Sequence, residues 1–128
     1  MILAARIIAG IVGLLHIWIF VMESILWMRP AIFKRFGVRT REEAETLKTA
    51  FLNQGFYNLF LATGALLGAI LFEMKPGFAP PIMVFACASI VGAGLVLLFS
   101  GGKKLMRAAI IQGLPPLIAI ILLIAANG

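Results

Sequence analysis

The chain has 128 residues, of which 62% are hydrophobic and 12% are charged, with a formal net charge of +6 and a mean hydropathy of +1.10. Charged residues normally make up about a quarter of a soluble domain. Too few polar residues remain to cover a soluble domain of this length, so the composition excludes that class and predicts an integral membrane protein.

Four apolar segments are long enough to cross a bilayer, because a hydrocarbon core of about 30 Å takes about 20 helical residues. They cover residues 2–27, 50–72, 81–100 and 105–126. We therefore predict an all-α fold, in which a single four-helix transmembrane bundle spans residues 1–128. The first segment carries His16 and Glu23 too deep for a cleaved signal peptide, and we interpret it as a retained span.

The loop after the first span contains two local signals. The segment 31–36 mixes apolar and basic residues, which is typical of an amphipathic segment lying on an anionic membrane surface, and Gly37 then breaks it. Thr40 and Glu43 have the spacing of a capping box. We expect a helix to begin there and to continue into the second span.

Small residues at four-residue spacing recur along the spans. Gly64 and Gly68 form a GxxxG pair in the second span, and Ala88 and Gly92 form a similar pair in the third. Such pairs favour close packing between membrane helices, either within one chain or between copies.

Seven polar side chains inside the predicted spans are candidates for a functional site. An ionisable group at the bilayer centre costs about 2.5–3.5 kcal/mol on insertion scales, so its presence calls for a role. The seven are His16 and Glu23 in the first span, Asn53, Gln54, Tyr57 and Asn58 in the second, and Gln112 in the fourth. In a regular helix the first two would share a face, about 10 Å apart along the axis.

The basic residues predict the orientation of the spans. Nine of the eleven lie between the first and second spans or at the turn from the third to the fourth, and only Arg6 and Lys75 lie on the other side. Because basic loops stay in the cytoplasm, loops 28–49 and 101–106 are expected inside and both termini outside. All seven polar groups then share the cytoplasmic half of the membrane, which predicts a common ligand-binding cavity.

Each polar residue also has a structural interpretation. Glu23 could form an ion pair with Arg29 or Arg107, and His16 could bond to a backbone carbonyl or to a facing amide. The amides could join helices, and Tyr57 could be a core aromatic residue. One histidine and one cysteine on separate spans predict no metal site. The sequence identifies no cofactor, and a haem ligated by His16 would rest on one residue.

His16, Glu23, Trp27 and Pro30 follow the spacing H-x6-E-x3-W-x2-P. Further along come Phe36-Gly37, the run from Asn53 to Asn58 (NQGFYN), and Gln112-x-Leu114-Pro115. With these elements the chain resembles, over almost its whole length, the membrane proteins of domain-of-unknown-function family 1304. It departs from the family pattern at Leu59, where the family has Gly, and at Leu15, where Glu is usual. The resemblance implies a small four-span protein of the bacterial inner (plasma) membrane and no established activity.

Three functional hypotheses follow. The first is binding or transport of a small or amphiphilic molecule, with Glu23 as a proton-sensitive group; a chain this short would need a homo-oligomer for transport. The second is a membrane-embedded enzyme in which Glu23, His16 and Tyr57 act as catalytic acid and base on an apolar or lipid-like substrate. The third is a structural role. Membrane lipids are expected partners, and nucleic acid is not, because membrane topology already accounts for the basic charge.

Overall fold

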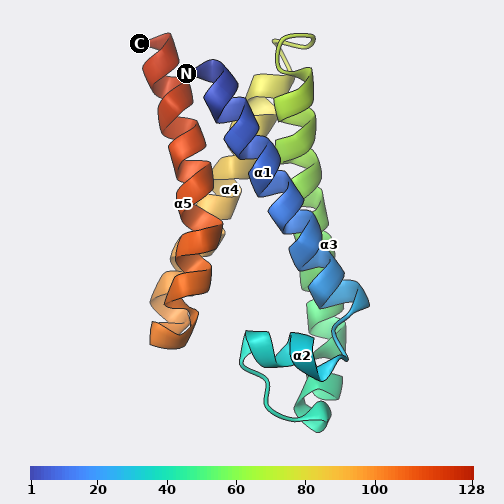
Figure 1. Ribbon diagram of the computed structural model, residues 1–128. Helices are drawn as coiled ribbons and strands as arrows, with labels where there is room; N and C mark the ends of the chain where they lie inside the picture. Colours follow the sequence, from blue (N-terminus) through green and yellow to red (C-terminus); the bar gives the residue numbers. More distant parts are fainter. The chain divides into compact units, whose positions relative to one another are not determined.

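The computed structural model describes residues 1–128 and contains only helices, turns and loops (Figure 1). The long helices are α1 (Ile2–Phe20), α3 (Arg41–Leu71), α4 (Ala79–Ser100) and α5 (Gly102–Asn127). Three short helical segments lie between α1 and α3: a π-helical turn, η1 (Val21–Ile25), the helix α2 (Pro30–Phe33) and a 3-10 turn, η2 (Lys34–Phe36).

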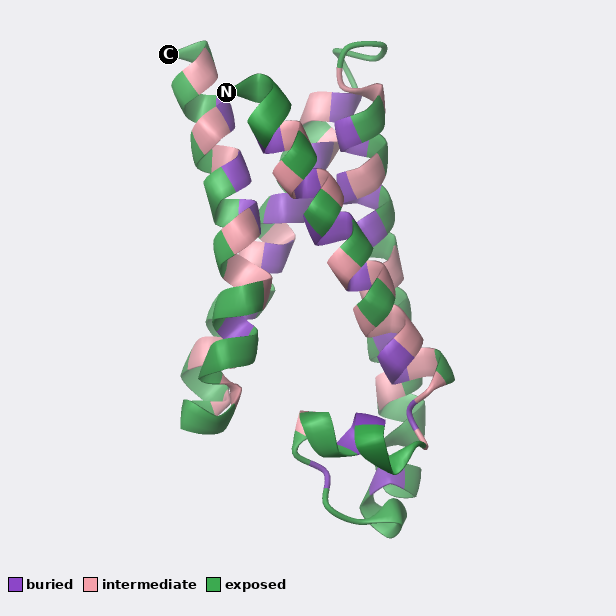
Figure 2. Ribbon diagram, in the orientation of Figure 1, coloured by how far each residue is buried: buried purple, intermediate pink, exposed green.

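Four helices are long and apolar enough to cross a membrane: Ile2–Ile25, Arg41–Leu71, Ala79–Ser100 and Gly102–Asn127. Each of them carries both buried and exposed residues along its length (Figure 2). The predicted all-α, four-span fold class is confirmed. The helices differ from the predicted spans mainly at α3, which begins at residue 41 rather than 50, as the capping box indicated.

The chain divides into two compact units. Unit 1 comprises residues 1–14 and 61–128, and unit 2 comprises residues 15–60. The assignment of the whole chain to one domain stays a prediction.

Small residues allow the helices of unit 1 to pack closely. Its core includes Ala5, Ala9 and Ala69, packed with Met83 and other apolar residues. A Cβ atom added at Gly68 would lie 2.7 Å from the backbone nitrogen of Met83, so α3 and α4 are in backbone contact there. The predicted close packing at the GxxxG pair is therefore confirmed. No atom lies within 4 Å of a Cβ added at Gly92, so the Gly92 position on α4 is open and supports no close helix contact within the chain.

Arg6 joins α1 to the end of α3 in unit 1. Its guanidinium forms a salt bridge with Glu73, and its Nε donates a hydrogen bond to the carbonyl of Ala69 at 3.0 Å. The same guanidinium lies over the ring of Phe72, 5.7 Å from its centroid. One cation thus meets a carboxylate, a carbonyl and an aromatic face.

An aromatic cluster organises unit 2. The ring of Trp27 stacks on that of Phe51 with centroids 3.7 Å apart, and Phe36 packs edge-on against both. The indole Nε1 of Trp27 donates a hydrogen bond to the carbonyl of Ala44 at 2.9 Å. The residue that ends the first span is thereby fixed to the first turns of α3.

The loop between α1 and α3 folds onto this cluster. Phe33 is part of the same buried core as Trp27, and Ile32 is also buried. Two apolar side chains of the amphipathic segment are therefore buried within the chain, and Phe33 packs in the core that contains Trp27. The placement of the segment on a membrane surface stays a prediction. Gly37 follows with a φ of 82°, a left-handed conformation that favours glycine and ends the segment as predicted.

The predicted capping box begins α3. The Thr40 hydroxyl accepts a hydrogen bond from the Glu43 amide at 3.1 Å. The Glu43 carboxylate accepts bonds from the amides of Arg39 at 3.0 Å and Thr40 at 3.4 Å. Backbone amides at the start of the helix thus gain side-chain partners.

Candidate functional site

The candidate site lies in unit 2, where the first span ends in the π-helical turn η1. The amide of Leu26 bonds to the carbonyl of Val21 at 2.9 Å, five residues back, instead of to the residue four back as in an α-helix. Such turns are rare and often occur at functional sites, because the extra residue changes the direction of the side chains around it. Glu23 lies at the centre of this turn.

Glu23 is buried without a cationic partner. Glu23 is only 3% exposed, and its Oε2 accepts a hydrogen bond from Nδ2 of Asn58 at 2.8 Å. The salt bridges in the structure join Arg6 to Glu73 and Lys48 to Glu45, so the ion pair between Glu23 and Arg29 that the sequence allowed is not formed. An ionised carboxylate in such a position is expensive unless a positive charge joins it.

Asn58 bridges two helices. Besides the bond to Glu23, its amide nitrogen lies 3.2 Å from the carbonyl of Gln54, one turn earlier in α3. This second bond fixes the orientation of the amide, so that its donor group faces the carboxylate. Asn58 is thus both a link between η1 and α3 and a preformed donor for Glu23.

Gly55 and Ser24 bring the two helices together beside this bond. A Cβ atom added at Gly55 would collide with the Ser24 hydroxyl and would lie 3.1 Å from Cβ of Glu23. The Ser24 hydroxyl donates to the carbonyl of Leu52 at 3.0 Å. Both residues belong to the site and neither was predicted as a functional residue. Gly55 lies inside the NQGFYN run, and its position in this motif is the feature of the sequence that could have identified it as part of the site.

The remaining predicted residues of unit 2 are placed differently. His16 is the other buried polar residue, at 1% exposure, and it lies on α1. Asn53 and Gln54 have exposed side chains, and Tyr57 is 60% exposed. The structure therefore brings Asn58 to Glu23 and leaves the other three polar residues of this run on exposed positions of α3.

Gln112 lies in α5, which belongs to unit 1, and it is half-buried. A cavity shared by all seven predicted residues stays a prediction.

The chain contains no cluster of side chains that could serve as metal ligands. No group of three or more His, Cys, Asp or Glu side chains that could hold a metal ion is present. Cys87 is buried in the apolar core of unit 1. The chemistry available at the site is that of one buried carboxylate held by an amide, which can exchange a proton or receive a positively charged group.

Together, four long apolar helices and a buried carboxylate at the end of the first span define a polytopic α-helical membrane protein with a polar group inside one of its spans. The chain belongs to the family described as "Protein of unknown function (DUF1304)", whose model matches residues 10–124. This confirms the family resemblance found in the sequence. No curated protein and no solved structure gives a significant match.

Proposed function

We propose that the protein binds, and in an oligomeric form transports, a small amphiphilic molecule, with Glu23 as the group that recognises it. The observation that carries this proposal is the pairing of Glu23 with Asn58. Glu23 is 3% exposed and lies in a π-helical turn, and its carboxylate has a neutral amide as its hydrogen-bond partner. A purely structural role would be served as well by an uncharged side chain.

The chemistry of the carboxylate favours a positively charged ligand. Moving a charge out of water is costly unless an opposite charge accompanies it. A proton would remove the cost, and so would the cationic head of an amphiphile. Because both would occupy the same carboxylate, the two should compete, and this competition provides the link between ligand and proton movement.

The orientation proposed from the basic residues sets the side from which the ligand enters. With loops 28–49 and 101–106 in the cytoplasm and both termini outside, Glu23 lies in the cytoplasmic half of a bacterial inner membrane. Its neighbour Trp27 and the basic loop that follows support this position, since aromatic and basic residues concentrate at that interface. The ligand would therefore reach the site from the inner leaflet.

Ligand binding can be measured on the purified protein in detergent. Dodecyltrimethylammonium, used below its micellar concentration, serves as the cationic probe, and dodecanol supplies the same chain without the charge. We expect the cationic probe to raise the melting temperature more than dodecanol does. The effect should shrink as the pH is lowered, because protons then compete for Glu23.

Glu23→Gln should abolish the difference between the two probes, while Glu73→Gln, the same change at a glutamate paired with Arg6, should keep it. The transport step is tested with both variants in liposomes under an imposed pH gradient and an internal pH-sensitive dye. Wild type and Glu73→Gln should show probe-dependent proton flux, and Glu23→Gln should not. Unchanged behaviour of Glu23→Gln in both assays would leave Glu23 and Asn58 as a structural link between helices.

The enzyme hypothesis has no observation that favours it over binding. Its third group, Tyr57, is 60% exposed on α3, whereas Glu23 and His16 are buried. Catalysis on an apolar substrate stays a prediction of the sequence.

A further inference from the structure

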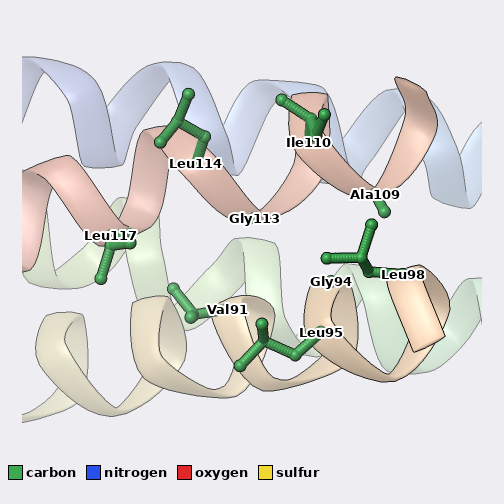
Figure 3. A pocket seen from close by; sticks show the side chains of 9 residues that line it. All are labelled: Val91, Gly94, Leu95, Leu98, Ala109, Ile110, Gly113, Leu114 and Leu117. Carbon is green, nitrogen blue, oxygen red and sulfur yellow. The ribbon is translucent and has the colours of Figure 1, made fainter. Parts of the chain in front are cut away.

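An apolar groove runs between α4 and α5 in unit 1. It has a volume of about 380 Å³, and every residue that lines it is apolar. Figure 3 shows the lining side chains coming from both helices. The groove contains none of the polar residues of the candidate site, so an inference about it is independent of the proposed function.

Two glycines at the base give the groove its depth. A Cβ atom added at Gly94 would lie 3.0 Å from the Cα of Gly113, so the two backbones meet there without side chains between them. Leu95 and Leu98 on α4 and Leu114 and Leu117 on α5 contribute the walls. Their side chains rise from a base made of backbone and enclose an apolar furrow between the two helices.

The wall on α5 continues into basic residues. Ile110, Leu114 and Leu117 follow one another at spacings of four and three, which keeps them on one face of the helix. Extending the same spacing toward the start of α5 leads to Arg107 and then Lys103. All five side chains are exposed. A single stripe therefore changes from basic to apolar along α5.

The cations at the start of α5 are not neutralised within the chain. Lys103 and Arg107 form no salt bridge, and the first turn of α5 contains no acidic residue. They also lie in the first turns of a 26-residue helix, whose dipole adds positive potential at this end. The basic end of the stripe therefore attracts an anion, and no acidic side chain of the chain pairs with it.

The length of the stripe matches one leaflet of a membrane. Arg107 and Leu117 are ten residues apart, which corresponds to about 15 Å along a helix. This is half of the hydrocarbon core, which is about 30 Å thick. A molecule that fills the groove and meets the cations therefore has a negative head at the membrane surface and an apolar chain about one leaflet long.

We propose that the groove between α4 and α5 is a binding site for an anionic phospholipid, whose phosphate meets Lys103 and Arg107 and whose acyl chain lies over Gly94 and Gly113. A second copy of the chain fits less well. A copy in the same membrane orientation would bring its own Lys103 and Arg107 to the same depth, where like charges repel.

Native mass spectrometry of the full chain, released from detergent with added lipid, tests both halves of the site. Dioleoyl phosphatidylglycerol is compared with dioleoyl phosphatidylcholine, which has the same chains and no net charge, and with dihexanoyl phosphatidylglycerol, which has the same head and short chains. We expect the first to bind more tightly than either of the others. Inorganic phosphate at equal concentration should not displace it, because phosphate lacks the chain.

The charge requirement is tested with the double variant Lys103→Gln and Arg107→Gln. Each cation near a lipid surface contributes about a fivefold factor, so the pair should lose about 25-fold in affinity for dioleoyl phosphatidylglycerol. The matched control, Lys34→Gln and Arg35→Gln, removes two exposed cations from the other unit and should retain wild-type affinity.

Three outcomes would overturn the site. Equal affinity for the two dioleoyl lipids would show that the cations do not recognise the lipid head. Equal loss of affinity in the two double variants would show that only the net charge of the protein matters. A lipid-free dimer that the double variant strengthens would assign the groove to a second copy of the chain.

Discussion

The two units hold their helices together by different means. In unit 1, the backbones of two helices approach each other at Gly68. The partly buried Arg6 forms a salt bridge with Glu73 and donates a hydrogen bond to a backbone carbonyl. In unit 2, aromatic rings and side-chain hydrogen bonds join η1 and the residues after it to α3, and Glu23 has an amide partner instead of a cation. The carboxylate of Glu73 in unit 1 therefore has a cationic partner within the chain, and the carboxylate of Glu23 in unit 2 has an amide partner instead.

This difference separates two uses of a glutamate in a membrane protein. Glu73 lies beyond the end of α3, where its side chain is 76% exposed and water can share its charge. Glu23 is 3% exposed inside the first span and forms no salt bridge. The ion pair of Glu73 joins α1 to the end of α3. The carboxylate of Glu23 has no cationic partner, so a positively charged ligand or a proton can compensate its charge.

The largest effect is expected at the aromatic cluster of unit 2. Trp27→Ala removes the ring stacked on Phe51 and the hydrogen bond to Ala44, so it should lower the free energy of unfolding by about 3–5 kcal/mol. Trp27→Phe keeps an aromatic ring and loses the donor, which should cost about 1 kcal/mol. Unfolding by sodium dodecyl sulfate, followed by circular dichroism, measures both. Equal losses would mean that the hydrogen bond, and not the packing, holds unit 2 together.

An intermediate effect is expected at the close packing of unit 1. Gly68→Ala would force apart α3 and α4, because the new Cβ would lie 2.7 Å from Cα and nitrogen of Met83 and a backbone cannot rotate away. We expect a loss of about 1–3 kcal/mol, typical of overpacking. Gly92→Ala is the matched control, since no atom lies within 4 Å of its Cβ, and the same unfolding assay should show no loss. If both variants were equally stable, backbone contact would not distinguish the units.

The sequence predicts the local parts of this fold well. The capping box of Thr40 and Glu43 and the break at Gly37 are encoded within a few neighbouring residues, and the structure has both. The start of α3 follows directly from them. The four spans are predicted equally well, because hydrophobic length alone decides whether a helix can cross a bilayer.

The candidate site is predicted only in part. Glu23 and Asn58 are recognisable as polar groups inside spans, but the choice of Asn58 over Gln54 or Asn53 as the partner of Glu23 depends on how η1 packs against α3 at Gly55. The π-helical turn has no signal in the hydrophobic pattern, since one extra residue shifts the turn without changing its composition. Long-range packing decides both features.

The smallest effects on stability should come from the two glutamates themselves, and they should differ in sign. Glu73→Gln removes an exposed ion pair with Arg6 and should cost less than about 1 kcal/mol, because water already weakens that pair. Glu23→Gln keeps a side-chain oxygen that can accept the Asn58 bond and removes a buried charge, so the variant should unfold no more easily than wild type and be somewhat more stable. The same unfolding assay, run on both variants, measures the difference. A clear loss for Glu23→Gln would show that the carboxylate stabilises unit 2 as Glu73 stabilises unit 1, and the distinction between the two glutamates would then be lost.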